Sequence, residues 1–117
     1  MSGIKKILFV CWVNKQRSKT ADDYYSSKYD SDEYEFDSAG TNLKICQKEG
    51  TNPLTEELVN WADLIFVMEN KHRQLINSHT KEKYDSKIKT LRIPDRFKYY
   101  QKELIEVLEE MVTPYLE

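Results

Sequence analysis

The stretch IKKILFVCWVNKQRSKTADDYY, residues 4–25, contains a run of apolar residues, a polar turn and the start of a helical pattern. The apolar run over residues 4–10 is typical of a strand buried on both faces, as in parallel sheets. Residues 18–29 carry apolar side chains at helical spacing, with Ser18 as the candidate N-cap. A strand that turns directly into a helix predicts the first unit of an alternating α/β fold.

The rest of the chain repeats this alternation. Further strands are predicted within residues 33–40, 62–68 and 86–93, and helices within residues 52–62, 69–77 and 99–116. Residues 42–53 are interpreted as mostly loop. The pattern predicts a doubly wound, flavodoxin-like α/β fold, with four parallel strands in the order 2-1-3-4 and helices on both faces. We expect one domain over residues 1–117.

Composition argues against several classes of partner. The net charge is only -2, so no overall field attracts the chain to nucleic acid or to anionic membranes, and neither is an expected partner. The apolar run near the N-terminus is too short to span a membrane and no cleavage site follows it, so we expect a cytoplasmic protein.

The chain has too few metal-ligating residues at suitable spacing to predict a metal site. Its two cysteines, Cys11 and Cys46, are expected to be reduced, because disulfide-built domains of this size usually contain more. The two histidines, His72 and His79, are seven residues apart on a polar stretch, without a zinc-ligand pattern. We therefore expect neither a metal nor a cofactor.

The turn after the first strand has the composition of an anion-binding loop. In open parallel sheets, sites form where strands end and helices begin, and the amides at a helix N-terminus attract anions. Arg17 would offer a planar fork to two phosphate oxygens. The predicted phosphate-binding loop consists of Cys11, Trp12, Val13, Asn14, Lys15, Gln16, Arg17 and Ser18.

A cysteine at the floor of such a loop has a possible chemical role. The surrounding amides and Arg17 would favour the thiolate of Cys11, which is the form that attacks phosphorus. Ser18 would hydrogen-bond the sulfur, and Asn14 tolerates the positive φ that a tight loop requires. The alternative is that Cys11 is a small apolar residue filling the end of a buried strand.

Three ordered motifs resemble the low-molecular-weight protein tyrosine phosphatase family. They are ILFVCWVNKQRSKTAD with its Cys-x5-Arg-Ser pattern, DSAGT after the second strand, and WADLIFVM as the third strand. The resemblance implies that Cys11 is the nucleophile, Arg17 the phosphate clamp and Ser18 the partner of the sulfur. It also implies that Asn14 is the structural pivot of the loop and that Ser38 braces it.

The family also uses a late aspartate to protonate the leaving oxygen. Asp95, in LRIPDRFKYY, matches that role, and Glu103 is a weaker candidate. Trp12, Phe97, Tyr99 and Tyr100 are candidate walls for a phenyl phosphate, although Phe97 and one tyrosine are equally suited to the core.

The sequence departs from the family at three places. Val13 stands where a small residue is common, and Gln16 stands where many members carry a second cysteine that protects the first. The acid loop reads Pro-Asp-Arg-Phe, residues 94–97, in place of the usual Asp-Pro-Tyr. The shape and redox protection of the loop are therefore open.

These observations predict a cysteine-dependent protein tyrosine phosphatase that hydrolyses phosphomonoesters through a phosphocysteine on Cys11. Its expected ligands are a phosphorylated protein, with phosphotyrosine preferred, or a small phosphomonoester, and inorganic phosphate or a similar oxyanion. One alternative is a module that binds phosphate or a phosphopeptide without turnover. Another is an arsenate reductase, which is less favoured because that reaction needs further cysteines.

Overall fold

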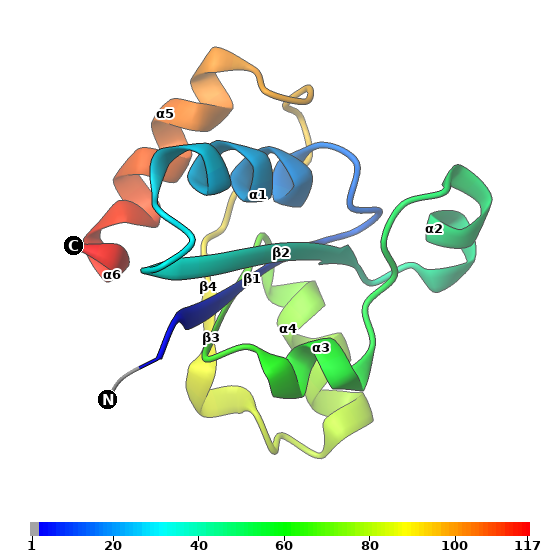
Figure 1. Cartoon of the computed structure of the whole chain (residues 1–117). Coiled ribbons are helices and arrows are strands. Elements are labelled where there is room, and N and C mark those ends of the chain that lie inside the picture. Colours follow the sequence, from blue (N-terminus) through cyan, green and yellow to red (C-terminus); the bar gives the residue numbers. More distant parts are fainter. Residues whose placement is uncertain (1–2) are drawn as a thin grey trace.

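Four parallel strands form the centre of the protein, which a computed structural model describes over residues 3–117 (Figure 1). The strands are β1 (Lys5–Cys11), β2 (Tyr34–Gly40), β3 (Leu64–Val67) and β4 (Ile88–Thr90), in the order β2-β1-β3-β4. Cys11, the last residue of β1, pairs with Gly40 at the end of β2. The predicted α/β class and strand order are confirmed.

Helices cover both faces of the sheet. One face carries α1 (Arg17–Lys28), α5 (Lys102–Met111) and α6 (Thr113–Leu116), and the other carries α3 (Glu56–Trp61) and α4 (Asn70–Thr80) (Figure 1). In β1, Ile7 and Phe9 pack with the first group, whereas Leu8 and Val10 pack with the second. Because successive side chains in a strand point to opposite faces, the continuous apolar run is buried on both sides.

A short helix, α2 (Leu43–Glu49), occupies a segment interpreted from the sequence as loop. It projects beyond the carboxyl end of β2, away from both helical layers (Figure 1). Asn42 caps it by accepting a hydrogen bond from Ile45 N at 3.0 Å, and Gly50 ends it in the left-handed region at φ 74°. These two residues are ordinary start and stop signals for a helix.

The helix boundaries differ from prediction in two further places. Helix α1 begins at Arg17, and Gln16 occupies the N-cap position, so Ser18 lies inside the first turn and is not the cap. The C-terminal helix divides at Val112 into α5 and α6, where Pro114 stands in the first turn of α6. Proline fits a first helical turn because it needs no amide donor there.

Candidate active site

The segment between β1 and α1 curls around a cavity of about 270 Å³ at the carboxyl edge of the sheet. The floor and sides come from six residues of this segment, Cys11, Trp12, Val13, Lys15, Gln16 and Arg17. Ile45 and Glu49 of α2 and Asp95, beyond β4, complete the lining. The cavity therefore lies where a doubly wound sheet normally binds its ligand.

The Cys11 sulfur has two hydrogen-bonding neighbours. Asn14 N donates to Sγ at 3.3 Å, and Ser18 Oγ lies 2.9 Å from Sγ. Ser18 Oγ also accepts from Asn14 Nδ2 at 2.9 Å, which leaves the serine hydroxyl hydrogen available to the sulfur. Two hydrogen-bond donors are therefore directed at this one sulfur.

Asn14 is the residue at which the loop reverses direction. It is buried, has φ 60°, and accepts a hydrogen bond from Asn52 N through Oδ1 at 3.2 Å. Asparagine adopts this left-handed conformation at lower cost than most side chains, and here both ends of its amide have partners. The structure thus gives Asn14 the geometry expected of a loop pivot.

The back of the loop is fixed through the carbonyl of Val13. Thr51 Oγ1 donates to Val13 O at 2.6 Å, and the thiol of buried Cys46 donates to the same oxygen at 3.3 Å. Gly40 permits this packing, because a Cβ added there would lie 2.6 Å from Cys46 Sγ and 2.7 Å from the Val13 carbonyl carbon. The end of β2 therefore packs so closely against the loop after β1 that position 40 has no room for a side chain.

The hydrogen bonds of Ser38 go to Asp22 and Asn52, whereas the resemblance implies that Ser38 braces Asn14. Its hydroxyl donates to Asp22 Oδ2 at 2.8 Å, and its carbonyl accepts from Asn52 Nδ2 at 2.7 Å. Asn52 bridges the two residues, since its own amide donates to Asn14. Burial raises the pKa of Asp22 despite the hydrogen bond from Ser38. The brace of the pivot is therefore Asn52, a residue that the sequence analysis missed.

Arg17 is almost fully buried, and one edge of its guanidinium is fixed. Nη1 donates to Glu69 Oε1 and to the carbonyl of Ile93, each at 2.8 Å, so both of its hydrogens have acceptors. The opposite edge is formed by Nε and Nη2. Within residues 3–117 its nearest partner is Asp95, whose Oδ1 lies 3.7 Å from Nε, and neither nitrogen has a hydrogen-bond acceptor there. Two parallel N–H groups on that edge match two oxygens of a phosphate.

Further donors for an anion come from the start of α1. The first backbone bond of this helix runs from Thr20 N to Gln16 O at 2.9 Å, so the amides before Thr20 have no acceptor within the helix. These amides and the helix dipole place positive potential beside the Cys11 sulfur. The arrangement suits a tetrahedral oxyanion held above the thiolate.

Asp95 lies at the mouth of the cavity with a side chain that is 55% exposed, beside Arg17. Glu103 lies in the first turn of α5 and does not line the cavity. Hydrogen bonds from its own backbone and from Gln101 lower the pKa of the Glu103 carboxyl. Of the two candidate acids, Asp95 is the one that shares the cavity with Cys11.

Solved structures with the same arrangement of elements exist, although no protein-family model and no curated protein matches the sequence. A YwlE mutant from Bacillus subtilis is 25% identical, with 97% of this chain and 99% of that chain aligned and a TM-score of 0.72. SP-PTP, a low molecular weight protein tyrosine phosphatase from Streptococcus pyogenes, is 22% identical, with 95% and 87% aligned and a TM-score of 0.70. In fold, the chain resembles the low molecular weight protein tyrosine phosphatase family.

A third structural neighbour carries a phosphorylated residue in its active site. It is a mutant of YwlE arginine phosphatase whose active-site serine is phosphorylated, 25% identical, with 93% of this chain and 94% of that chain aligned and a TM-score of 0.70. In this neighbour of the same fold, phosphate is therefore attached covalently to the active-site residue.

Of the four aromatic residues predicted as walls of the phosphatase cavity, Trp12 lines it and the other three do not. Phe97 is buried in the core beneath α1 and α5. Tyr99 donates from its hydroxyl to Asp23 Oδ2 at 2.5 Å, and Tyr100 N donates to Thr20 Oγ1 at 2.8 Å, so both pack along α1. Phe97, Tyr99 and Tyr100 are close together in the sequence, but their side chains have different surroundings, which the sequence spacing does not indicate.

The missed wall of the phosphatase cavity comes from α2. Ile45 supplies an apolar side chain, and Glu49 forms an ion pair of 3.1 Å with Lys15 of the loop. On the Trp12 side, Lys71 Nζ lies 5.4 Å from the indole centroid. The helix signals of Asn42 and Gly50 were the evidence in the sequence that could have revealed α2.

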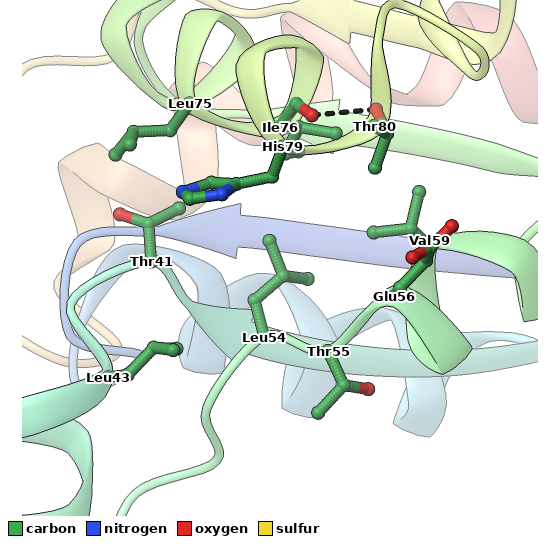
Figure 2. A pocket seen from close by; sticks show the side chains of 10 residues that line it. All are labelled: Thr41, Leu43, Leu54, Thr55, Glu56, Val59, Leu75, Ile76, His79 and Thr80. Atoms are coloured by element: carbon green, nitrogen blue, oxygen red, sulfur yellow. Dashed lines mark hydrogen bonds between the residues drawn. The ribbon is translucent and has the colours of Figure 1, made fainter.

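A second hollow of about 210 Å³ lies on the other side of the sheet's carboxyl edge, between α3, α4 and the start of α2. Figure 2 shows Leu54 pointing toward α4, the helix from which the side chains of Leu75 and His79 extend. Half of the residues that line the hollow are aliphatic, the others are three threonines, a glutamate and a histidine, and the lining contains no cysteine or arginine. The hollow therefore lacks the cysteine and arginine that line the first cavity.

Two features are absent from residues 3–117 of this phosphatase-like fold. No group of three or more histidine, cysteine, aspartate or glutamate side chains in this range could hold a metal ion. None of the helices in the same range has the length and apolar composition that a membrane crossing requires.

Proposed function

We propose that residues 1–117 form one low molecular weight phosphatase domain that hydrolyses phosphomonoesters, with phosphotyrosine preferred. The observation that carries this proposal is the position of the Cys11 sulfur, which has hydrogen-bond donors around it and shares its cavity with Arg17, whose Nε–Nη2 edge is not held by Glu69 or Ile93. Both groups line one cavity. A structural cysteine needs neither a buried cation nor an aspartate at the same opening.

The first half of the reaction transfers the phosphoryl group to sulfur. The amides at the start of α1 and the Nε–Nη2 edge of Arg17 would hold the phosphate oxygens, and the Cys11 thiolate would attack phosphorus in line with the ester oxygen. The phosphorus–oxygen bond breaks as the phosphorus–sulfur bond forms. Asp95, in its acid form, would give its proton to the departing phenolate.

The second half releases inorganic phosphate. Asp95, now a carboxylate, would take a proton from a water molecule that attacks the phosphocysteine. The phosphorus–sulfur bond breaks, and sulfur leaves as a thiolate stabilised by the Ser18 hydroxyl and by Asn14 N. Trp12 and Ile45 at the cavity wall would pack against the phenyl ring.

Phosphoarginine is the second substrate to consider, because a neighbour in fold is an arginine phosphatase. Carboxylates of Glu49 and Asp95 lie at the cavity and would suit a guanidinium group. Lys15, however, pairs with Glu49 and adds a positive charge at the same rim. The apolar wall of Trp12 and Ile45 therefore favours the aryl ester over the guanidinium.

The alternative of an arsenate reductase receives less support. That chemistry requires a second thiol to attack the first, and the other cysteine, Cys46, is buried against Val13 O at the back of the loop. A phosphate-binding module without turnover would not need Asp95 beside Arg17.

The proposal is tested by assaying wild type and Cys11→Ser with phosphotyrosine, phosphoserine and phosphoarginine peptides and with nucleotides. Wild type should hydrolyse phosphotyrosine fastest and should carry phosphate on Cys11 when mass spectra are taken during turnover. Cys11→Ser should lose turnover while still binding phosphate. Phosphate binding without hydrolysis by wild type would indicate a binding module, and full activity in Cys11→Ser would refute the mechanism.

A further inference from the structure

We infer that Glu69 is a positioning residue for the proposed phosphatase reaction. By accepting a hydrogen bond from Arg17 Nη1, it turns the guanidinium so that the Nε–Nη2 edge faces the phosphate site. The inference rests on the proposed function, but its central test measures the binding of inorganic phosphate and not turnover.

Two acceptors from different parts of the chain determine the orientation of Arg17. Glu69 precedes α4, and Ile93 follows β4, and each accepts one hydrogen of Nη1 at 2.8 Å. If Glu69 were removed and only the Ile93 carbonyl remained, one N–H of Arg17 Nη1 would have no acceptor, although Arg17 is only 2% exposed. A buried donor without an acceptor is costly, so the side chain would turn toward other acceptors. Asp95 is close enough to be one of them.

Glu69 is itself held in place. Its backbone amide donates to Nδ1 of the fully buried His72 at 3.0 Å, and Lys71 Nζ lies 3.7 Å from Oε1. Burial acts to raise the pKa of Glu69, but the hydrogen bond and charge of Arg17 outweigh it and hold that pKa below its ordinary value. The acceptor therefore remains ionised while Arg17 binds an anion.

If Glu69 acted only through its negative charge, it would weaken the binding of phosphate. A carboxylate next to the arginine that binds phosphate reduces the attraction between that arginine and a dianion. Only its effect on the direction of the guanidinium would strengthen binding. Orientation and charge thus predict opposite signs for the loss of Glu69, which makes the two roles separable.

The experiment compares wild type, Glu69→Ser and Glu69→Gln by calorimetric titration with inorganic phosphate. Glu69 occupies the N-cap position of α4, and serine is a favourable N-cap that is too short to reach Arg17. Glu69→Ser should therefore stay folded and bind phosphate about 10-fold more weakly, the loss expected for one charge-assisted hydrogen bond. Glu69→Gln keeps an acceptor oxygen and should bind at least as tightly as wild type.

Glu49→Ala supplies the matched control for charge. It removes another carboxylate at the cavity, one that pairs with Lys15 and not with Arg17, and should bind phosphate more tightly. If Glu69→Ser, folded by its thermal melt, also binds more tightly, Glu69 acts through charge and the inference is overturned. If Glu69→Ser does not fold, Glu69→Gln decides, because a 10-fold loss in that variant would contradict the orientation role.

The outcomes for wild type separate this inference from the proposed function. Hydrolysis of aryl phosphate by wild type, with tighter phosphate binding in Glu69→Ser, would leave the function standing and remove the role of Glu69. Phosphate binding by wild type that weakens in Glu69→Ser, without any hydrolysis, would support the orientation role and remove the proposed function. Failure of wild type to bind phosphate would overturn both.

Discussion

Arg17 and Asp95 face each other at the opening of the cavity, with 3.7 Å between Arg17 Nε and Asp95 Oδ1. The two residues come from opposite ends of the chain and meet because parallel strands end at the same edge of the sheet. This distance is longer than a hydrogen bond. The edge of Arg17 that would hold phosphate therefore lies beside the carboxyl group that would protonate the leaving oxygen.

Asp95→Asn should slow the hydrolysis of esters with poor leaving groups far more than that of p-nitrophenyl phosphate. Phenyl phosphate needs a proton on its departing oxygen, and we expect kcat for it to fall about 100-fold, a typical contribution of general acid catalysis. Glu103→Gln, which changes a carboxyl outside the cavity, is the control. An equal fall for both substrates in Asp95→Asn would contradict the acid role.

Gly40→Ala should destabilise the protein and reduce its activity together. The added Cβ would lie 2.7 Å from the Val13 carbonyl carbon and 2.9 Å from Asn14 N, so backbone atoms of the phosphate loop must move. Overpacking of this kind costs about 1–3 kcal/mol of unfolding free energy, measured by denaturant titration. Adding Cys46→Ala should not restore activity, because it relieves only the sulfur contact.

Gly3→Ala provides the comparison for this prediction. A Cβ at Gly3 would meet no atom within 4 Å, so its unfolding free energy should stay within about 0.5 kcal/mol of wild type. An unchanged Gly40→Ala variant would mean that the loop has more room than its packing indicates.

Acid should destabilise the protein through His72. Burial and the charge of Arg17 lower the pKa of His72 from its ordinary 6.5 to about 4. Between these two pH values the unfolded chain takes up a proton that the folded chain does not, so stability falls as the pH falls. Above pH 6.5 this contribution to stability is fully present, and by pH 4 about 3 kcal/mol of unfolding free energy has been lost through His72.

Denaturant titrations of wild type and His72→Gln over this pH range would measure the effect. Glutamine does not titrate, so the variant should show a shallower decline in unfolding free energy, although carboxyl groups will still contribute. His79→Gln, which changes an exposed histidine, should keep the wild-type slope. Parallel declines for wild type and His72→Gln would contradict a neutral, buried His72.

The order of elements and the polar loop between β1 and α1 were predictable because both depend on local patterns. The apolar run of β1 and the cysteine and arginine on either side of a polar turn are visible in adjacent residues. The partners of that loop were not predictable in the same way. Glu69 and Asn52 reach it from distant segments, through contacts that no periodicity encodes.

Two interpretations differed from the structure because a side chain had a second, equally common use. Ser18 is a residue type that often serves as an N-cap, but it lies in the first turn of α1 and its hydroxyl is bonded to the Cys11 sulfur. Phe97 follows Asp95 by two residues, but its ring is part of the core. Only the path of the chain decides between such uses.

The Val13–Asn14 peptide group lies between the two thiols of the protein. Cys46 donates to its carbonyl oxygen and Cys11 accepts from its N–H, and these groups of a trans peptide point in opposite directions. Position 16, where the resemblance implies a protecting cysteine in many family members, is glutamine. With the loop in this conformation, Cys11 and Cys46 cannot form a disulfide that protects Cys11 from further oxidation. Reduction of an oxidised Cys11 would therefore require a thiol from another molecule.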